Sequence, residues 1–392
     1  MASPAESRQY YLDWLRVLSI FLVFVYHSVR IFGVEAFHIN NPVVYPAGDS
    51  LGMVLTTWGM PLIFLVAGAS AYFSLTRYTP GRYIKDRALR LLVPFAVGLF
   101  THIPILVYLE RVNRGEFAGT FFEFAPHYFD GWYGFGGNFA WMGLHLWFLM
   151  MLFLYTLISL PILLLLMRGR SLERIGRFLA QPGAIYLLAA PIILLSTRLH
   201  PDTFGIRIFG GWNVFVYLAF LVYGFLMVPA EPVRARIERD RWISLVAALA
   251  FLVIGGVIRA GGSDLHFATY RYTLFFTIQA LCAWCGLLAI WGFSIRNLNY
   301  GTVALYLANE AVLPFYVLHQ TVLVIIGFYV VQWPLPDLLK FIVIFSASLA
   351  VIIGVYWFLI RPVNVMRCLF GMRPKATSRR PLPTGPNPGV IG

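Results

Sequence analysis

Apolar stretches separated by short polar or basic segments run along almost the whole chain. Stretches of about 18 or more apolar residues are typical of membrane-spanning helices. The pattern predicts an all-α polytopic membrane protein with ten spans, at residues 11–32, 51–75, 88–109, 144–167, 184–199, 211–229, 242–262, 270–293, 310–331 and 337–360. The fifth segment is short, which indicates a tilted or partly re-entrant helix. Residues 299–310, just before the ninth segment, are predicted to form a short helix at the membrane interface.

The composition fits one membrane-embedded domain. Of the 392 residues, 59% are hydrophobic and only 12% are charged, whereas a soluble domain carries about 25% charged residues. No stretch between the apolar segments is long enough to form a separate soluble domain. We therefore expect a transmembrane domain over residues 1–360, followed by a basic, Pro- and Gly-rich cytoplasmic tail at 361–392 that is disordered.

Positive charge is concentrated in every second loop. The formal net charge is +13, but the basic residues fall between hydrophobic segments, which favours contact with membrane lipid and argues against binding of nucleic acid. Because basic loops face the cytoplasm, both termini are predicted to be cytoplasmic. The basic loops and the tail contain Arg77, Arg82, Lys85, Arg87 and Arg90, then Arg168, Arg170, Arg174 and Arg177, then Arg234, Arg236, Arg239 and Arg241, and finally Arg361, Arg367, Arg373, Lys375, Arg379 and Arg380.

The segment at 110–142 is predicted to be an outer loop. It is long, aromatic and Gly-rich, and its few charges include Glu110. Loops of more than about 12–15 residues are usually functional or disordered, and this many aromatic side chains indicate either packed structure or stacking on sugars. Trp141 lies four residues before His145, so the two are predicted to be neighbours on a helix.

The first apolar segment carries ionisable side chains that a lipid-facing helix would not contain. Asp13, Arg16 and His27 lie in it, with Arg30 near its end. Arg16 and His27 are eleven positions apart, which places them on one helical face, about 16 Å apart along the axis, and Asp13 shares that face. Two structural explanations remain open: Arg16 can extend to the membrane surface, and His27 can be a hydrogen-bonded core residue. Ionisable groups on one face of a span, however, usually point into a cavity and mark a transport pathway or a reaction site.

Cys282 and Cys285 match the C-x-x-C pattern inside an apolar helical segment. A redox motif of this kind is expected beside strands, so packing of small side chains between helices is the better interpretation. No spacing of His, Cys, Asp or Glu typical of a metal site is present in the sequence, and no cofactor is predicted.

Four motifs, in order along the chain, resemble the acyltransferase 3 family of membrane acyltransferases. They are LDWLRVLSIFLVFVYHS, with ten residues between Arg16 and His27, the stretch from MPLIFLVAGAS to the Arg87-Ala-Leu-Arg90 pair, HLWFL at 145–149, and LPFYVLHQTVL at 313–323. The resemblance covers nearly the whole membrane domain. The region of the second segment is most similar to the glucan biosynthesis protein C branch, which is associated with succinylation of periplasmic glucans.

The resemblance implies transfer of an acetyl- or succinyl-type group from cytoplasmic acyl-CoA to a hydroxyl group of an extracytoplasmic glycan, at the inner membrane of a bacterium. His27 is the expected base, because an imidazole with a pKa of about 6.5 can take a hydroxyl proton at neutral pH. Asp13 is expected to orient Arg16, and Arg16 to bind a phosphate or the thioester carbonyl of the donor. Arg87 and Arg90 are expected to hold the phosphates of CoA; the alternative is a role in topology or contact with anionic lipid.

Four further residues are candidates for the acceptor site or the cavity wall. His145 and Trp147 open the fourth segment beside the aromatic loop, although Trp is also ordinary at a membrane interface. His319 lies in a stretch that resembles the family, and has either an inward-facing structural role or a direct one. Glu310 needs a cationic or hydrogen-bonding partner, and its spacing of nine from His319 places the two on opposite helical faces.

The alternative function is a secondary transporter or exporter that uses intramembrane His, Arg and Glu residues as a relay. Transporters commonly have internal repeats and broken-helix pairs, and neither is visible in the sequence. A structural membrane subunit is disfavoured because several ionisable residues lie within predicted spans. The sequence therefore favours a membrane O-acyltransferase with acyl-CoA and a glycan as its partners.

Overall fold

The computed structural model describes residues 8–203, 210–262 and 265–375, and apart from one isolated bridge pair the regular elements in these ranges are all helical. This confirms the predicted all-α membrane class. Within these ranges, seven helices are long and apolar enough to cross a membrane, and the number rises to nine if each of two bent helix pairs is one span.

Each of the ten predicted segments contains a helix, but only seven to nine of them qualify as spans within the described residues. The long spans are α1 (Tyr10–Arg30), α2 (Pro46–Leu75), η2 with α6 (Leu144–Leu146 and Trp147–Leu166), α10 (Glu231–Ala260), α11 (Tyr270–Asn297), α12 (Val303–Val330) and α13 with η4 (Asp337–Val355 and Tyr356–Ile360). The bent pairs are α3 with α4 (Pro80–Phe100 and Ile103–Asn113), at 42°, and α7 with η3 and α8 (Ser171–Leu179, Ala184–Leu188 and Ala189–Arg198), at 111°. The sharper bend lies at the fifth predicted segment and agrees with a partly re-entrant course. The sixth segment is α9 (Val214–Met227), whose 14 residues are fewer than the about 20 that a perpendicular span needs.

The predicted interface helix at 299–310 does not exist as a separate element. Thr302 caps α12, because its Oγ1 accepts the backbone N–H of Leu305 at 3.0 Å, and the helix then runs without a break from Val303. The earlier start adds Asn309 to the helix that carries Glu310 and His319.

Glycine allows α2 and α9 to cross with their backbones in contact. A Cβ on Gly68 would lie 1.8 Å from the carbonyl oxygen of Leu221, and a Cβ on Gly224 would lie 1.8 Å from that of Leu65. Small residues at such crossings are typical of packing between membrane helices. The crossing fixes the position of α2, which packs along α1.

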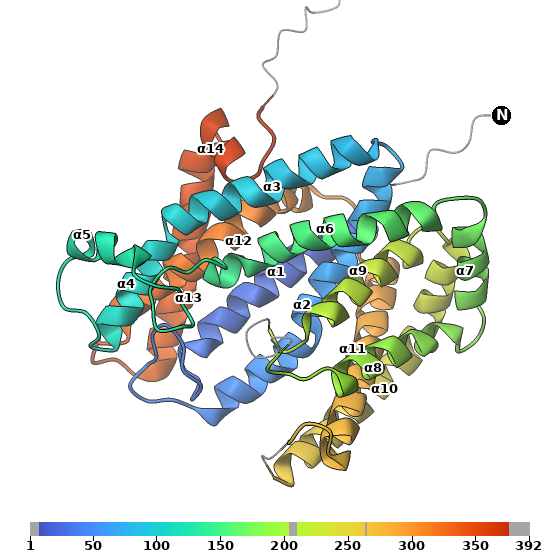
Figure 1. Ribbon diagram of the computed structural model, residues 1–392, viewed down its shortest axis with the longest axis horizontal. Helices are drawn as coiled ribbons and strands as arrows, with labels where there is room; N and C mark the ends of the chain where they lie inside the picture. The colour runs from blue at the N-terminus through green and yellow to red at the C-terminus, as the bar shows by residue number, and fades with distance from the viewer. Residues whose placement is uncertain (1–7, 204–209, 263–264, 376–392) are drawn as a thin grey trace, which may run out of the picture.

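α1 lies in the middle of the bundle and packs against α2 and α12 (Figure 1). Leu15 and Phe24 of α1 are buried, at 1% and 0% exposure. Because protein surrounds much of this helix, its polar side chains can face protein cavities instead of lipid.

The aromatic segment between α4 and η2 is compact, which supports packed structure over a purely open loop. Thr120 and Glu123 form a capping box at α5 (Phe121–Phe124), and η1 (Ala125–Phe129) follows. Tyr128 is buried, and its hydroxyl donates to the carbonyl oxygen of Leu99 at 3.0 Å. Four aromatic side chains of this segment remain exposed, namely Phe122, Phe129, Trp132 and Phe135.

Trp141 and His145 are not helix neighbours, contrary to the prediction. The chain turns at Gly143, with φ of +74°, and the helix begins only at Leu144. Trp141 instead packs against Trp132, with ring centroids 5.7 Å apart.

Residues 361–375, the first part of the predicted tail, lie against the bundle. They contain α14 (Asn364–Leu369), which contacts α3 and η4, and the side chain of Arg367 is buried. This part of the chain therefore has a defined structure. Residues 376–392 lie outside the described residues, and the division of the chain at residue 360 stays a prediction.

Candidate functional site

Arg16 is held by side chains from three helices. Its Nη1 donates to Asp13 Oδ1 at 3.1 Å and to Asn309 Oδ1 at 2.9 Å, and its Nη2 donates to Ser70 Oγ at 2.8 Å. Asn309 Nδ2 also donates to Asp13 Oδ1, and Arg8 Nη2 donates to Asp13 Oδ2 at 2.8 Å. These contacts support the predicted orienting role of Asp13. They also tie the Arg16 guanidinium to α2 and α12.

Arg16 borders a cavity of about 610 Å³, which we call the Arg16 cavity. The Arg16 side chain is 34% exposed, so part of the guanidinium stays accessible from this space. Arg87 and Arg90 of α3 line the same cavity, so the structure brings the three predicted donor-side arginines together. The charged residues of its wall are Arg8, Asp13, Arg16, Arg77, Asp86, Arg87, Arg90 and Glu310, with basic side chains in excess.

Glu310, one of the four candidates for the acceptor site or the cavity wall, lines the Arg16 cavity. Its carboxylate accepts hydrogen bonds from Arg367 Nη1 at 2.8 Å, Arg361 Nε at 3.3 Å and the Tyr356 hydroxyl at 3.1 Å. The partner that the sequence could not identify is therefore a pair of arginines from the start of the predicted tail.

His27 lines a second cavity of about 820 Å³, which we call the His27 cavity. His27 Nδ1 lies 2.9 Å from the carbonyl oxygen of Val23 and 3.1 Å from His319 Nε2. His319 Nδ1 lies 2.6 Å from the carbonyl oxygen of Tyr316. A carbonyl oxygen only accepts, so in both histidines we assign the proton to Nδ1. His319 Nε2 then accepts from His27 Nδ1–H, and His27 Nε2 keeps its lone pair.

His145 and His319 lie behind His27 and do not line the His27 cavity. Both are buried, at 6% and 1% exposure, and their ring centroids are 5.1 Å apart. His145 Nε2 donates to the carbonyl oxygen of Val317 at 3.1 Å, whereas its Nδ1 has no partner among the described residues. Of the four acceptor-side candidates, only Trp147 lines the His27 cavity.

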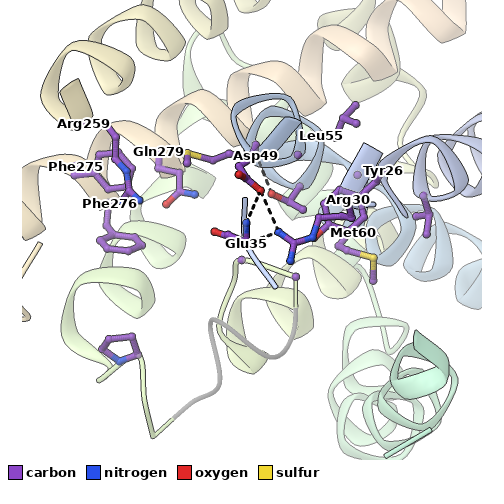
Figure 2. A pocket seen from close by; sticks show the side chains of 18 of the residues that line it. Tyr26, Arg30, Glu35, Asp49, Leu55, Met60, Arg259, Phe275, Phe276 and Gln279 are labelled. Atoms are coloured by element: carbon purple, nitrogen blue, oxygen red, sulfur yellow. Dashed lines mark hydrogen bonds and ion pairs between the residues drawn. The ribbon is translucent and has the colours of Figure 1, made fainter. Parts of the chain in front are cut away.

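Charged, amide and aromatic side chains face each other across the His27 cavity. Figure 2 shows Arg30 pointing towards Glu35 and Asp49, with Phe275 and Gln279 on the other side. Arg30 Nη1 pairs with Glu35 and lies 3.6 Å from Asp49 Oδ1. Gln279 Oε1 has no hydrogen-bond partner within the described part of the chain. The cavity therefore offers hydrogen-bonding groups and apolar ring faces together, and sequence reasoning identified only Arg30 among these residues.

α1 lines both cavities, one after the other along its length. Asp13, Arg16 and Ile20 border the Arg16 cavity, and Val23 and His27 border the His27 cavity. α6 also contributes to both cavities, because Trp147 lines the His27 cavity and its neighbour Phe148 lines the Arg16 cavity. Arg16 and His27, which were predicted to share one helical face, thus line two different cavities that adjoin along α1.

A buried carboxylate that the sequence assigned to the outer loop lies in α4. Glu110 is 0% exposed and accepts hydrogen bonds from His38 Nδ1 and from the Tyr133 hydroxyl at 2.8 Å, and it lies 2.9 Å from Arg114 Nη1. Burial and the Glu110 carboxylate raise the pKa of Tyr133. This cluster ties the aromatic segment and the segment after α1 to α4.

Cys282 and Cys285 are buried in α11, where Cys282 Sγ donates to the carbonyl oxygen of Ala248 at 3.4 Å. These contacts fit a packing role for the two thiols. Over residues 8–203, 210–262 and 265–375, no group of three or more His, Cys, Asp or Glu side chains is placed to hold a metal ion.

The chain is similar to known proteins over most of its length. The acyltransferase 3 family, described as an acyltransferase domain, matches residues 9–359. The chain is 22% identical over 374 residues to glucans biosynthesis protein C of Salmonella paratyphi B, and 23% identical over 372 residues to that of Salmonella paratyphi A; each alignment covers 90% of this chain and 92% of the relative. No solved structure matches the chain. The matches confirm the resemblance found in the sequence motifs.

Proposed function

The chain belongs to the acyltransferase 3 family and is an integral membrane acyltransferase, and on this basis we propose that it transfers an acyl group from acyl-CoA in the Arg16 cavity to a hydroxyl group of a glycan in the His27 cavity. The observation that carries the proposal is that α1 lines two adjoining cavities, one rich in arginine and one with an imidazole in its wall. A donor with phosphate groups and a hydroxyl acceptor need these two different environments.

The Arg16 cavity fits the phosphate groups of CoA. Arg87 and Arg90 supply charged donors at its wall, and guanidinium groups match phosphate geometry well. Arg16 lies deeper along α1 and holds a phosphate of the donor. A donor of this kind carries its acyl group at the end of a long flexible arm, which suits the about 16 Å between Arg16 and His27 along the helix.

The His27–His319 pair activates the acceptor hydroxyl. As the hydroxyl oxygen attacks the acyl carbonyl carbon, His27 Nε2 takes the hydroxyl proton. The bond from the acyl carbon to the sulfur of CoA then breaks, and the His27 imidazolium gives its proton to the CoA thiolate. His319 holds the His27 ring through the 3.1 Å contact and accepts its Nδ1–H, which stabilises the positive charge that develops on the ring.

The acceptor is a glycan, and the acyl group is of the acetyl or succinyl type. The relatives are named glucans biosynthesis protein C, which supports a glucan acceptor. The His27 cavity combines the Trp147, Phe275 and Phe276 rings with the Glu35 and Asp49 carboxylates. Ring faces and carboxylate acceptors are the groups that pack on sugars and receive their hydroxyl hydrogen bonds.

The Arg16 cavity opens to the cytoplasm of a bacterial cell, and the His27 cavity opens to the other side of its inner membrane. Arg8 and Met372, near the two ends of the described chain, both line the Arg16 cavity. Basic loops in alternate positions support a cytoplasmic location of both ends. The matched relatives are bacterial, which supports this location.

Membrane vesicles of known orientation test this function. Inside-out vesicles that enclose glucan are supplied from outside with acyl-CoA labelled in its acyl group. We expect the label to appear in an ester of the enclosed glucan, whereas right-side-out vesicles supplied in the same way should give none. Label that enters as free acid without forming an ester would identify a transporter and overturn the proposed function.

Replacing both Arg87 and Arg90 with Gln is expected to raise the KM for acyl-CoA at least about tenfold, because the loss of even one charge-assisted contact of about 1.5–3 kcal/mol corresponds to that factor. The KM for the glucan acceptor should stay near the wild-type value. Steady-state kinetics in inside-out vesicles, with each substrate varied in turn, measure both constants.

The matched control replaces Arg82 and Lys85 with Gln. These residues belong to the same basic stretch but do not line the Arg16 cavity, and Arg82 lies over the Tyr78 ring. The control removes the same amount of loop charge, so it should affect orientation equally and donor KM little. Equal donor KM values in the two double variants would leave the arginines with a topological or lipid-contacting role only.

A further inference from the structure

The segment 361–373, which we call the C-terminal segment, follows the last residue of the family match and packs beside the Arg16 cavity. The family match ends at residue 359. The segment contains α14, which contacts α3. The C-terminal segment, which the family match does not cover, therefore lies next to the space assigned to the donor.

Ion pairs at two places hold the C-terminal segment. Glu310 of α12 binds Arg361 and Arg367, and the Arg367 side chain is only 8% exposed. Within the segment, Arg367 Nε donates to the carbonyl oxygen of Arg373 at 2.8 Å. Arg373 Nη2 in turn lies 3.3 Å from Asp86 Oδ1 of α3. The segment is thus fixed to the helices on both sides of it.

The end of the segment forms part of the cavity wall. Gly371 and Met372 both line the Arg16 cavity. Gly371 has φ of +70°, and a Cβ there would lie 2.5 Å from the carbonyl oxygen of Arg90 and 2.6 Å from Leu313 Cδ2. The close approach of the segment to α3 therefore requires glycine at this position.

The C-terminal segment also forms a hydrogen bond with Arg90. The carbonyl oxygen of Gly371 accepts from Arg90 Nε at 3.4 Å, which leaves the Nη groups of Arg90 for another partner. Asp86 lies 4.0 Å from Arg90 Nη1 but 3.3 Å from Arg373 Nη2. Arg373 thus shares the Asp86 carboxylate with Arg90 and makes the shorter contact, which weakens the competition between Asp86 and a phosphate for Arg90.

We propose that the C-terminal segment completes the donor site: Gly371 and Met372 form a wall of the pocket for acyl-CoA, and Gly371 and Arg373 position Arg90 for a phosphate of the donor. Glu310 is then a positioning residue, because it holds the segment through Arg361 and Arg367. This inference rests on the proposed function, which assigns acyl-CoA to the Arg16 cavity.

The first test is Gly371→Ala, which changes no charge. The added methyl group has no space and the backbone conformation is strained, so the wall must move. We expect the KM for acyl-CoA to rise about tenfold, with kcat and the KM for glucan close to wild type. The control is Gly169→Ala, at φ of +58° with open space around the site, which carries the backbone strain without a clash. Equal donor KM values for the two variants would overturn the inference.

The second test does not depend on activity. Met372→Cys is made together with Cys368→Ser, because Cys368 is an exposed thiol in α14. CoA is expected to slow alkylation of the new thiol by a charged maleimide, since both would occupy the same cavity. If wild-type activity saturates with acyl-CoA but CoA gives no protection, the segment is not part of the donor site. If acyl-CoA supports no transfer by the wild type, the proposed function itself fails.

Discussion

Replacing His27 with alanine is expected to lower the rate of acyl transfer by about 10²–10⁴-fold, the usual contribution of a general base. The variant keeps the apolar wall of the cavity but has no group that takes the hydroxyl proton. His319, at a 3.1 Å contact from the lost ring, does not line the His27 cavity and cannot replace it. Transfer of labelled acyl groups to glucan in inside-out vesicles, normalised to the amount of membrane-inserted protein, measures the loss.

The control for this variant is His127→Ala. His127 is 57% exposed, pairs with Asp130 in the aromatic segment and lines neither cavity. It should transfer acyl groups at the wild-type rate. Wild-type activity of both variants at equal protein levels would remove His27 from the chemistry and leave it as a core residue.

Replacing Arg16 with lysine is expected to lower activity by about 10- to 100-fold, although the positive charge is kept. The guanidinium binds Asp13 and Asn309 through one nitrogen and Ser70 through the other. A single ammonium group cannot reach partners on three helices with this geometry. Asp13 keeps Arg8 as a partner, so no buried carboxylate is left alone and the protein should still fold. The same vesicle assay gives kcat and the KM for acyl-CoA.

Ser70→Ala provides a graded comparison for Arg16→Lys. It removes only the 2.8 Å contact to Nη2 and leaves the Asp13 and Asn309 contacts in place. Its activity should therefore lie between the wild type and Arg16→Lys. Full activity of Arg16→Lys would mean that Arg16 serves only as a charged anchor of α1.

The helices could be located from the sequence because an apolar run of membrane length has few alternatives. The ends of the helices could not be located from the sequence, because a helix can continue into polar residues where other parts of the protein cover those residues. α10 begins at Glu231, eleven residues before the apolar segment predicted to start at 242. α12 similarly includes Asn309 and Glu310, two polar residues that interrupt the apolar run. Both line the Arg16 cavity, and Asn309 accepts a hydrogen bond from Arg16. The predicted third span ended at residue 109, one short of the buried Glu110.

Residue spacing could predict the candidate site only where a single helix carries it, whereas Arg87 and Arg90 of α3 were identified through the resemblance to the family. Asp13, Arg16 and His27 share α1, so their relative positions follow from helical geometry. The partners that hold them come from elsewhere: Asn309 is 293 residues from Arg16, and His319 is 292 residues from His27. Such contacts depend on how the helices pack, and no local pattern in the sequence encodes them. Helix packing also separates the four candidates for the acceptor site or the cavity wall. Trp147 lines the His27 cavity, whereas Glu310 lines the Arg16 cavity.

The most direct test of the central claim is mass spectrometry of periplasmic glucans from three otherwise identical bacterial strains, which carry the wild-type gene, no gene, or the His27→Ala gene. The wild-type strain should contain glucans whose masses are raised by whole numbers of one acyl group. The other two strains should lack these species, and mild base, which cleaves esters, should remove them from the first. Identical glucan masses in all three strains, or acylated glucans in the His27→Ala strain at the wild-type level, would contradict the account.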